Sequence, residues 1–249
     1  MAQEVFKRTE KKYLLDKGTY EKLIFRLNQY MERDRYFDSE ILSLYYDTPD
    51  YRLIRTSIEK PVFKEKVRLR TYGVPTDDST AFLEYKRKFK GVVYKRRTFM
   101  ALDDTLRFIK GEDVEENNPQ IERELRYAFR YYNDLAPRML VSYHRNSYFG
   151  KEDSNLRITF DDNILYRGYD LDLRKGLYGR QLLNEGQRLM EIKIPGAMPL
   201  WLSHILDELK IYPRSMSKYG TAYTTLMMEN ALNGRDRFSV NAESVKRAI

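Results

Sequence analysis

The stretch FLEYKRKFKGVVYKRR (residues 82–97) decides which kind of fold to expect from this chain. Aromatic and β-branched residues lie on both sides of Gly91, a pattern typical of two strands joined by a tight turn. Seven of the residues in this stretch are nevertheless Lys or Arg. Like charges on neighbouring strands repel each other, so a hairpin of this composition needs something anionic close to it.

The overall composition points in the same direction. The chain has 249 residues, of which 42% are hydrophobic and 33% charged, and its formal net charge is +8. That length suffices for one large domain or two small ones with a proper core. A basic surplus indicates an anionic partner, which could be a nucleic acid, an acidic membrane or a phosphate compound.

Several classes of protein are excluded by residues that the sequence lacks. Cysteine is absent, which rules out disulfides, thiolate nucleophiles and cysteine zinc sites, and the presence of only two histidines rules out a histidine-rich metal site. There is no apolar run long enough to span a membrane and no apolar stretch near the start that resembles a signal peptide. We therefore expect a soluble cytoplasmic protein without a membrane segment.

Hydrophobic periodicity predicts about eight strands, mostly sequential and antiparallel, with helices in the connections. We expect one domain over residues 1–232 and a polar tail over 233–249. The predicted strands are 6–15, 40–47, 63–73, the two arms of the hairpin 81–99, 138–150, 155–164 and 187–195. The predicted helices are 17–31, 121–133, 199–210 and 218–232.

Charged residues alternate with apolar ones along most of these strands, which assigns them to opposite faces. For a single strand, a solvated sheet face explains such alternation equally well. Over the whole set, however, the charged faces are dominated by Lys and Arg. We therefore expect an α+β fold in which eight antiparallel strands close into a barrel, or tunnel. Its lumen would be lined by Lys and Arg, helices would cover its outside, and a triphosphate or phosphate chain would be its natural ligand.

These segments resemble, in order along the chain, the VTC domain, the catalytic domain of vacuolar transporter chaperone polyphosphate polymerases in the triphosphate tunnel metalloenzyme superfamily. The resemblance covers about residues 6–220. It is carried by RTEKKYLL (8–15), SLYYDT (43–48), KVRLRTYG (66–73), FLEYKRK (82–88), VVYKRR (92–97), SYHRNSYF (142–149), LRITFDDNI (156–164), MEIKIP (190–195) and SMSKYG (215–220).

The resemblance implies transfer of the γ-phosphate of ATP to a growing polyphosphate chain with release of ADP, assisted by Mn²⁺ or Mg²⁺. ATP and polyphosphate would be the partners, and any membrane component would be a separate protein. Arg68, Arg70, Lys218 and Glu191 would be catalytic, with Glu191 as the metal ligand. The implied phosphate-binding residues are Lys12, Arg68, Arg70, Lys86, Lys95, Arg145, Arg157, Ser217 and Lys218.

Physical reasons accompany these assignments. Arginine suits bidentate contacts to phosphate and lysine acts as a point charge, while Ser217 and Lys218 stand where a helix is expected to begin, a position that favours anions. Related tunnel enzymes carry Glu-x-Glu-x-Lys in the first strand, where this chain has Arg8, Glu10 and Lys12. The missing first glutamate argues against a hydrolase with two metal-binding carboxylates, and Glu10 could equally be a counter-ion.

Three alternatives stay open at this point. The chain could hydrolyse inorganic or organic triphosphates, or it could bind polyphosphate or inositol polyphosphate without catalysis. A basic, aromatic sheet can also bind single-stranded nucleic acid, but the sequence contains no recognisable RNA-binding motif, and we do not expect a nucleic-acid partner. His144 has the opposite parity to Arg145, so we expect it to lie outside the lumen.

Overall fold

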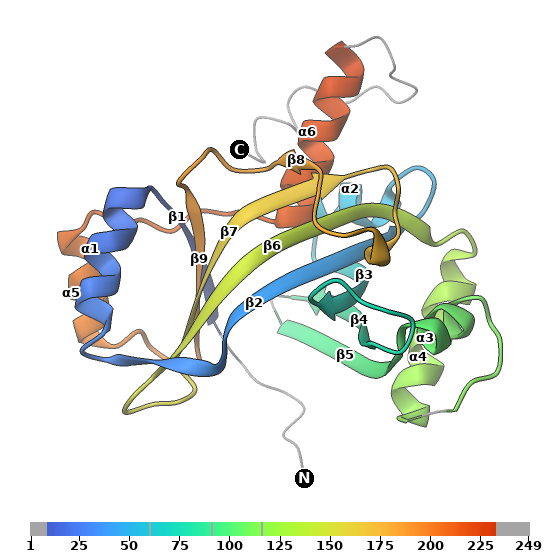
Figure 1. Cartoon of the computed structure of the whole chain (residues 1–249), viewed down its shortest axis with the longest axis horizontal. Coiled ribbons are helices and arrows are strands. Elements are labelled where there is room, and N and C mark those ends of the chain that lie inside the picture. Colours follow the sequence, from blue (N-terminus) through green and yellow to red (C-terminus); the bar gives the residue numbers. More distant parts are fainter. Residues whose placement is uncertain (1–8, 60, 91, 116, 233–249) are drawn as a thin grey trace. The chain divides into compact units, whose positions relative to one another are not determined.

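The computed structural model describes residues 9–59, 61–90, 92–115 and 117–232, which form an α+β fold around one large sheet (Figure 1). The elements in chain order are β1 (Thr9–Leu15), α1 (Lys17–Leu27), β2 (Met31–Asp47), α2 (Arg52–Ile58), β3 (Phe63–Tyr72), β4 (Thr80–Phe89), β5 (Val92–Ala101), α3 (Leu102–Ile109), α4 (Pro119–Tyr132), β6 (Ala136–Gly150), β7 (Arg157–Arg167), the 3₁₀ turn η1 (Leu173–Lys175), β8 (Arg180–Gln181), β9 (Arg188–Ile194), α5 (Leu200–Glu208) and α6 (Lys218–Leu232).

The sheet follows the order β1-β9-β7-β6-β2-β3-β4-β5, with β8 paired to β7 outside this path. The pairs β1–β9, β7–β9, β2–β3, β3–β4 and β4–β5 are antiparallel, which agrees with the predicted strand number and direction. Within the described residues, however, the hydrogen-bonded path has two ends, at β1 and β5. Backbone hydrogen bonds therefore do not close the sheet, and the predicted closed barrel is not confirmed.

The elements agree with the sequence prediction where local signals are strong. Asp16 accepts a hydrogen bond from the amide of Thr19 at 2.8 Å and so starts α1 where expected. The hairpin is also confirmed, because Phe89 and Val92 pair at the ends of β4 and β5. Gly91 itself, the start of the predicted strand 6–15 and the predicted tail 233–249 lie outside the described residues.

The prediction was wrong at several boundaries. The helix predicted over 17–31 ends at Leu27, and the strand expected to start at residue 40 begins at Met31. Met31 packs as a strand residue in a core, while the polar stretch that follows it carries no apolar periodicity. Helices α2 and α3 were not predicted at all. None of the helices formed by the described residues is long and apolar enough to span a bilayer.

The chain divides into two compact units, each assembled from several segments. Unit 1 takes the residues up to Glu40, Tyr143–Ile164 and Gln181–Met216. Its core lies where α1 and α5 cover one face of β1, β9 and β7 (Figure 1). Leu23 and Ile205 of these helices are buried against outward side chains of the strands such as Phe160. The opposite faces of the same strands carry the charged residues.

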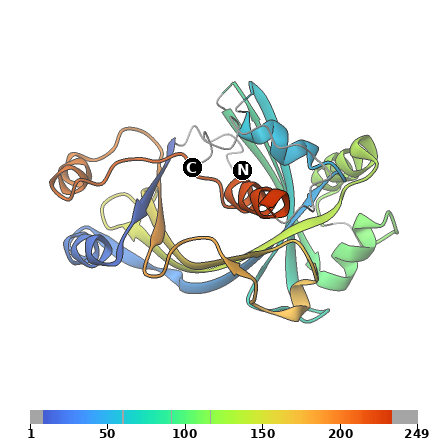
Figure 2. The ribbon, with the colours of Figure 1, turned by 90° about the horizontal axis from the view of Figure 1, so that it is seen from above.

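Unit 2 takes Ile41–Ser142, Leu165–Arg180 and the residues from Ser217 onwards. Helices α3 and α4 cover one face of β3–β5, and α6 lies on the opposite side (Figure 2). Val67, Leu83 and Leu125 are fully buried in the core between these strands and helices. The strand positions that alternate with this core therefore point away from α3 and α4.

Asp47, at the end of β2, holds two helices of unit 2 in place. Its fully buried carboxylate accepts hydrogen bonds from the amides of Leu53 and Ile54 at 2.8 and 3.0 Å and from the hydroxyl of Tyr219 at 2.9 Å. It also accepts one from the amide of Thr48 at 2.9 Å. One side chain thus satisfies two amides in the first turn of α2 and anchors the beginning of α6.

We predict that Asp47→Ala lowers the free energy of unfolding by about 2–4 kcal/mol, because buried donors lose their acceptor. Urea unfolding followed by circular dichroism measures this loss. The matched control is Asp50→Ala, since Asp50 is half exposed and its loss should cost less than about 1 kcal/mol. Equal losses in the two variants would contradict the anchoring role of Asp47.

Candidate functional site

The face of β3–β5 that points away from α3 and α4 carries a row of cations. Val67 and Leu69 are buried in the core, so Arg68 between them and Arg70 after Leu69 face the other way. The antiparallel register then places Glu84 directly beside Arg68 on one side and beside Arg97 on the other. Three strands therefore bring one carboxylate and its flanking cations to the same level of the sheet.

Glu84 is the centre of this arrangement. Its Oε2 accepts from Arg68 Nε at 2.6 Å, and its Oε1 accepts from Arg97 Nε at 2.8 Å and from Lys95 Nζ at 2.7 Å. Arg70 Nε lies 4.0 Å from Oε2. We call these five residues the Glu84 cluster. The Glu84 side chain is only 2% exposed, whereas those of Lys95 and Arg97 are 44% and 33% exposed, so the cations separate the carboxylate from solvent.

The charge state of Glu84 follows from two opposing effects. Burial acts to raise its pKa, but the cations Arg68, Arg70, Lys95 and Arg97 outweigh burial and hold the pKa well below its usual range. Glu84 is therefore ionised at neutral pH. Since four cations surround this one carboxylate among the described residues, the cluster keeps a surplus of positive charge.

Tyr45 connects this cluster to the start of α6. Its hydroxyl accepts from Arg68 Nη1 at 3.4 Å, and its ring stacks on Tyr219 with centroids 4.4 Å apart. Burial acts to raise the pKa of Tyr45, but the charges of Arg68, Arg70 and Lys218 lower it. Lys218, the first residue of α6, therefore acts electrostatically on the same Tyr45 hydroxyl as the two arginines.

Ser217 and Lys218 begin a helix, as the sequence predicted. The hydroxyl of Ser217 accepts from the amide of Gly220 at 3.2 Å and from Lys66 Nζ at 2.9 Å. The register places Lys66 beside Lys86, and Lys86 beside Lys95. Unit 2 thus brings together most of the predicted phosphate-binding residues. These are Arg68, Arg70, Lys86, Lys95, Ser217 and Lys218.

Unit 1 holds a second charged cluster on the face of β1 and β9 that points away from α1 and α5, which we call the inner face of this unit. Lys12 lies opposite Glu191 in the register, and its Nζ is 3.3 Å from a carboxylate oxygen of Glu191 and 3.3 Å from one of Glu10. Arg145 Nη2 lies 3.6 Å from the other oxygen of Glu191, and Lys193 Nζ lies 3.9 Å from it. We call these residues the Glu191 cluster. Glu10 is a counter-ion of Lys12 here, which was one of its two predicted roles.

The other predicted cations of unit 1 are already paired with aspartates. Arg145 makes a bidentate contact with the fully buried Asp161, at 2.5 Å from Nε and 2.7 Å from Nη2. Arg157 follows the same face but is half exposed, and its Nη2 lies 3.0 Å from Asp34. The structure therefore places Arg145 beside Glu191, whereas the guanidinium of Arg157 contacts β2 instead.

The carboxylates around Glu191 in the described part of the chain are too few to hold a divalent ion by themselves. The described residues contain no group of three or more acidic or histidine side chains that could hold a metal. Glu10 and Glu191 share the ammonium group of Lys12, so two carboxylates lie near one point. Mg²⁺ and Mn²⁺ bind through one or two carboxylates when phosphate oxygens and water complete the shell, and these residues fit an ion that arrives with its phosphate.

The cations of the hairpin divide between the two faces of the sheet. Arg87 and Arg96 face α4, where they contact Glu124 at 2.7 and 3.0 Å, while Lys95 and Arg97 face Glu84. His144 lies outside the charged inner face of unit 1, as predicted, because its ring nitrogens contact Asp162 and Asp38.

The predicted site residues did not include Arg97, Lys66 or Tyr45. Arg97 has the parity of Lys95, and Lys66 has that of Arg68, so the alternation already contained the signal for both. Strand parity also places Glu84 on this face, but its role as counter-ion to four cations depends on the register of three strands. Nothing local in the sequence indicates the stacking of Tyr45 on Tyr219.

Comparison with known proteins adds the family context. The family model of the VTC domain matches residues 7–227, and no curated protein matches the chain. A crystal structure of a candidate adenylate cyclase from Bacillus halodurans is 13% identical, with a TM-score of 0.53 over 87% of this chain and 96% of that one. A candidate adenylyl cyclase from Hippeastrum, described as having a dominant triphosphatase activity, is 14% identical, with a TM-score of 0.50 over 87% and 95%. These similarities show a shared fold.

We predict that Glu84→Gln lowers the free energy of unfolding by about 2–4 kcal/mol at neutral pH, because it leaves four cations without their buried counter-ion. The folded-state pKa of Glu84 is depressed. The stabilisation that ionised Glu84 gives to the folded state is therefore fully present above its unfolded-state pKa of about 4.3. It is lost as pH falls through the lower pKa of the folded state. The free energies of unfolding of the wild type and of Glu84→Gln, measured at decreasing pH, should therefore converge.

Inorganic tripolyphosphate should raise the melting temperature of Glu84→Gln more than that of the wild type, since the anion replaces the missing charge. Glu124→Gln is the matched control, because Glu124 bridges Arg87 and Arg96 on the opposite face and its loss should leave the tripolyphosphate response unchanged. A wild-type-like response in Glu84→Gln would contradict anion binding at this cluster.

Proposed function

Because the chain belongs to the VTC-domain family, we propose that it is a polyphosphate polymerase. It would transfer the γ-phosphate of ATP to a polyphosphate chain and release ADP, with a divalent ion assisting. ATP and polyphosphate are its proposed partners. The tunnel that the family resemblance implies is part of this proposal, with phosphate groups bound along its inner, cation-bearing strand faces. Residues 1–232 would form the catalytic domain.

The observation that carries the proposal is the surplus of cations around Glu84. Four cations converge on one buried carboxylate, and Lys66 and Lys86 continue the row along the same strand faces. A surface that only faces water has no need for this imbalance, because each added cation repels the others. A chain of phosphates supplies negative charge at regular intervals and would relieve the repulsion along the whole row.

The residue types suit phosphoryl transfer. The reaction depends mainly on positioning and on stabilising charge at the transferred group, and it needs no nucleophile from the protein. Arg68 and Arg70 are held by Glu84, Tyr45 and Ser43, so their forked donors are ordered before a phosphate binds. Lys218 and the first amides of α6 would bind the terminal phosphates, since a helix N-terminus favours anions.

Glu191, with Glu10 beside it, would hold the divalent ion together with oxygens from the phosphate. When bound, Mn²⁺ or Mg²⁺ would neutralise part of the phosphate charge. The chain's own residues would orient the carboxylates. Lys12 lies between Glu10 and Glu191, and Arg145 is fixed by Asp161 against the other side of Glu191.

Triphosphate hydrolysis is the second candidate. The proximity of Glu10 and Glu191 around Lys12 favours it, since a carboxylate pair can hold a metal that activates water. The triphosphatase activity described for the Hippeastrum protein of the same fold points the same way. The two reactions differ only in the acceptor of the phosphoryl group, which is a phosphate chain in one and water in the other.

We predict that pure protein incubated with ATP and Mn²⁺ yields long chains on a gel stained for polyphosphate, with ADP in matching amount. Arg70→Ala should lower kcat/KM for ATP by at least about tenfold, because it removes a charged phosphate contact. Free phosphate without chains would replace the polymerase proposal with the hydrolase. Neither product, with protein still stabilised by ATP, would indicate a binding module.

The control for Arg70→Ala is Arg96→Ala. It removes the same charge from the same three-stranded region, but Arg96 faces Glu124 and α4. Its kinetics should match those of the wild type. Similar losses in both variants would attribute the effect to net charge and not to the Glu84 cluster.

We predict that Glu191→Gln abolishes metal-dependent turnover while largely sparing affinity for tripolyphosphate, because it removes a metal ligand and no cation. Turnover is measured over a series of Mn²⁺ concentrations, and affinity by calorimetry without metal. Surviving turnover would move the metal ligand to Glu10. Loss of tripolyphosphate affinity would indicate instead that Glu191 serves to position Lys12 and Arg145.

A further inference from the structure

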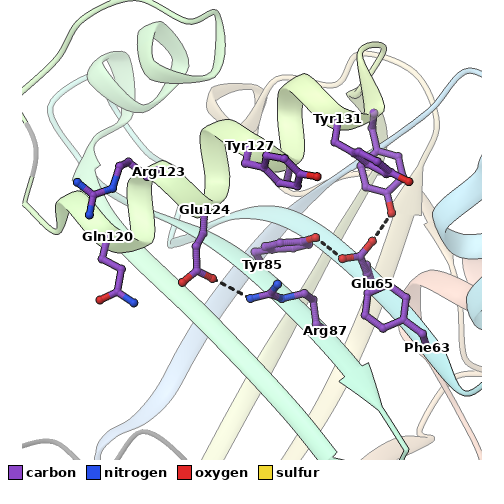
Figure 3. A pocket seen from close by; sticks show the side chains of 11 residues that line it. Phe63, Glu65, Tyr85, Arg87, Gln120, Arg123, Glu124, Tyr127 and Tyr131 are labelled. Atoms are coloured by element: carbon purple, nitrogen blue, oxygen red, sulfur yellow. Dashed lines mark hydrogen bonds and ion pairs between the residues drawn. The ribbon is translucent and has the colours of Figure 1, made fainter.

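A pocket of about 550 Å³ opens on the other face of β3 and β4, beneath α4 in unit 2 (Figure 3). Glu65, Tyr85 and Arg87 of the strands line its floor, and α4 supplies the opposite wall. These strand residues have the opposite parity to Arg68 and Glu84. The pocket is therefore separate from the Glu84 cluster, and the proposed reaction does not use it.

Glu65 makes one end of this pocket acidic. It is 8% exposed, and its two carboxylate oxygens accept hydrogen bonds from the hydroxyls of Tyr85 and Tyr132. Burial and the adjacent carboxylate raise the pKa of both tyrosines, so both stay protonated donors. Among the described residues no cation forms an ion pair with Glu65. Neutral phenols orient this carboxylate but leave its charge uncompensated, which is costly for a buried group.

Aromatic rings surround the acidic end. Tyr127 and Tyr131 lie one turn apart on α4 with centroids 5.9 Å apart and nearly parallel, and they are 66% and 60% exposed. Tyr131 also meets Tyr132 edge to face at 5.0 Å, and the half-exposed Phe63 lines the opposite side (Figure 3). Exposed rings around a carboxylate offer both components that bind organic cations.

At the other end of the pocket, two arginines share one carboxylate. Arg87 Nη2 contacts Glu124 at 2.7 Å, and Arg96 Nε contacts the same carboxylate at 3.0 Å (Figure 3). One carboxylate for two arginines leaves this end of the pocket positive, and Arg123 lines the pocket as well. Glu65 is the buried carboxylate of this pocket and has no ion pair among the described residues, so a cationic group would bind at its end.

We propose that this pocket binds a small organic ammonium compound, with its cationic nitrogen against the carboxylate of Glu65 and the rings of Tyr127 and Tyr131. The volume accommodates a quaternary ammonium group and an aliphatic stem that extends towards Arg87 and Glu124. The bound cation supplies the counter-ion that Glu65 lacks, while the phenols of Tyr85 and Tyr132 keep their hydrogen bonds.

Choline and cadaverine are the probes, and 3,3-dimethylbutan-1-ol is the uncharged analogue of choline. Calorimetric titration of the full chain should show saturable binding of at least one of the two cations, and at least about tenfold weaker binding of the uncharged alcohol. Binding of choline alone would assign the site to methylated ammonium groups, and binding of cadaverine alone to primary amines. Absence of binding for both cations, or equal affinity for the alcohol, would overturn the proposal.

Glu65→Gln keeps the shape of the side chain and removes its charge, so it should weaken binding at least about tenfold. Tyr131→Leu, at an exposed position that does not threaten folding, should weaken it several-fold. Tyr169→Leu is the matched control, since Tyr169 is similarly exposed in unit 2 but does not line the pocket. Unchanged affinity in both Glu65→Gln and Tyr131→Leu would overturn the proposal, and phosphate-transfer activity should stay unchanged in both.

Discussion

Repulsion between cations on adjacent strands is the constraint on which the rest of this structure depends. Arg68 and Arg70 of β3 and Lys95 and Arg97 of β5 converge on Glu84 of β4, because an antiparallel sheet places cross-strand side chains close together. Glu84 makes this arrangement tolerable by accepting charged hydrogen bonds from both sides. It does so incompletely, since one carboxylate faces four cations. The resulting surplus destabilises the folded state, and in the proposed function it is what binds a polyanion.

The cations of the hairpin have different counter-ions on its two faces. On the inner face the partner of the cations is a strand residue, Glu84, and the positive surplus remains. On the outer face α4 supplies Glu124, which bridges Arg87 and Arg96. Helix packing thus supplies a counter-ion to the outer face, while the inner face keeps the larger positive surplus. The outer face also holds Glu65, whose carboxylate accepts hydrogen bonds from two phenols and has no ion pair among the described residues.

Much of the candidate site could be predicted because strand parity is a local property. The alternation in KVRLRTYG places Arg68 and Arg70 on one face whatever the rest of the chain does, and the start of α6 at Lys218 follows from local helix signals. The partners of these residues could not be predicted in the same way. Arg157 shares a face with Glu191 in the sequence pattern, yet its guanidinium reaches Asp34 of β2, a strand that lies beyond β6 in the sheet.

The sequence by itself determined the hairpin, most of the strands, the charged and apolar faces and the family, since these follow from short-range periodicity and from motifs in a fixed order. Tertiary structure alone decided which carboxylate meets which cation. Glu84 lies in the middle of its cluster only because β3, β4 and β5 pair in one register, and a shift of one residue would turn it to the opposite face. Contacts between distant segments, such as Tyr219 with Asp47, depend on how helices pack, which no local pattern encodes.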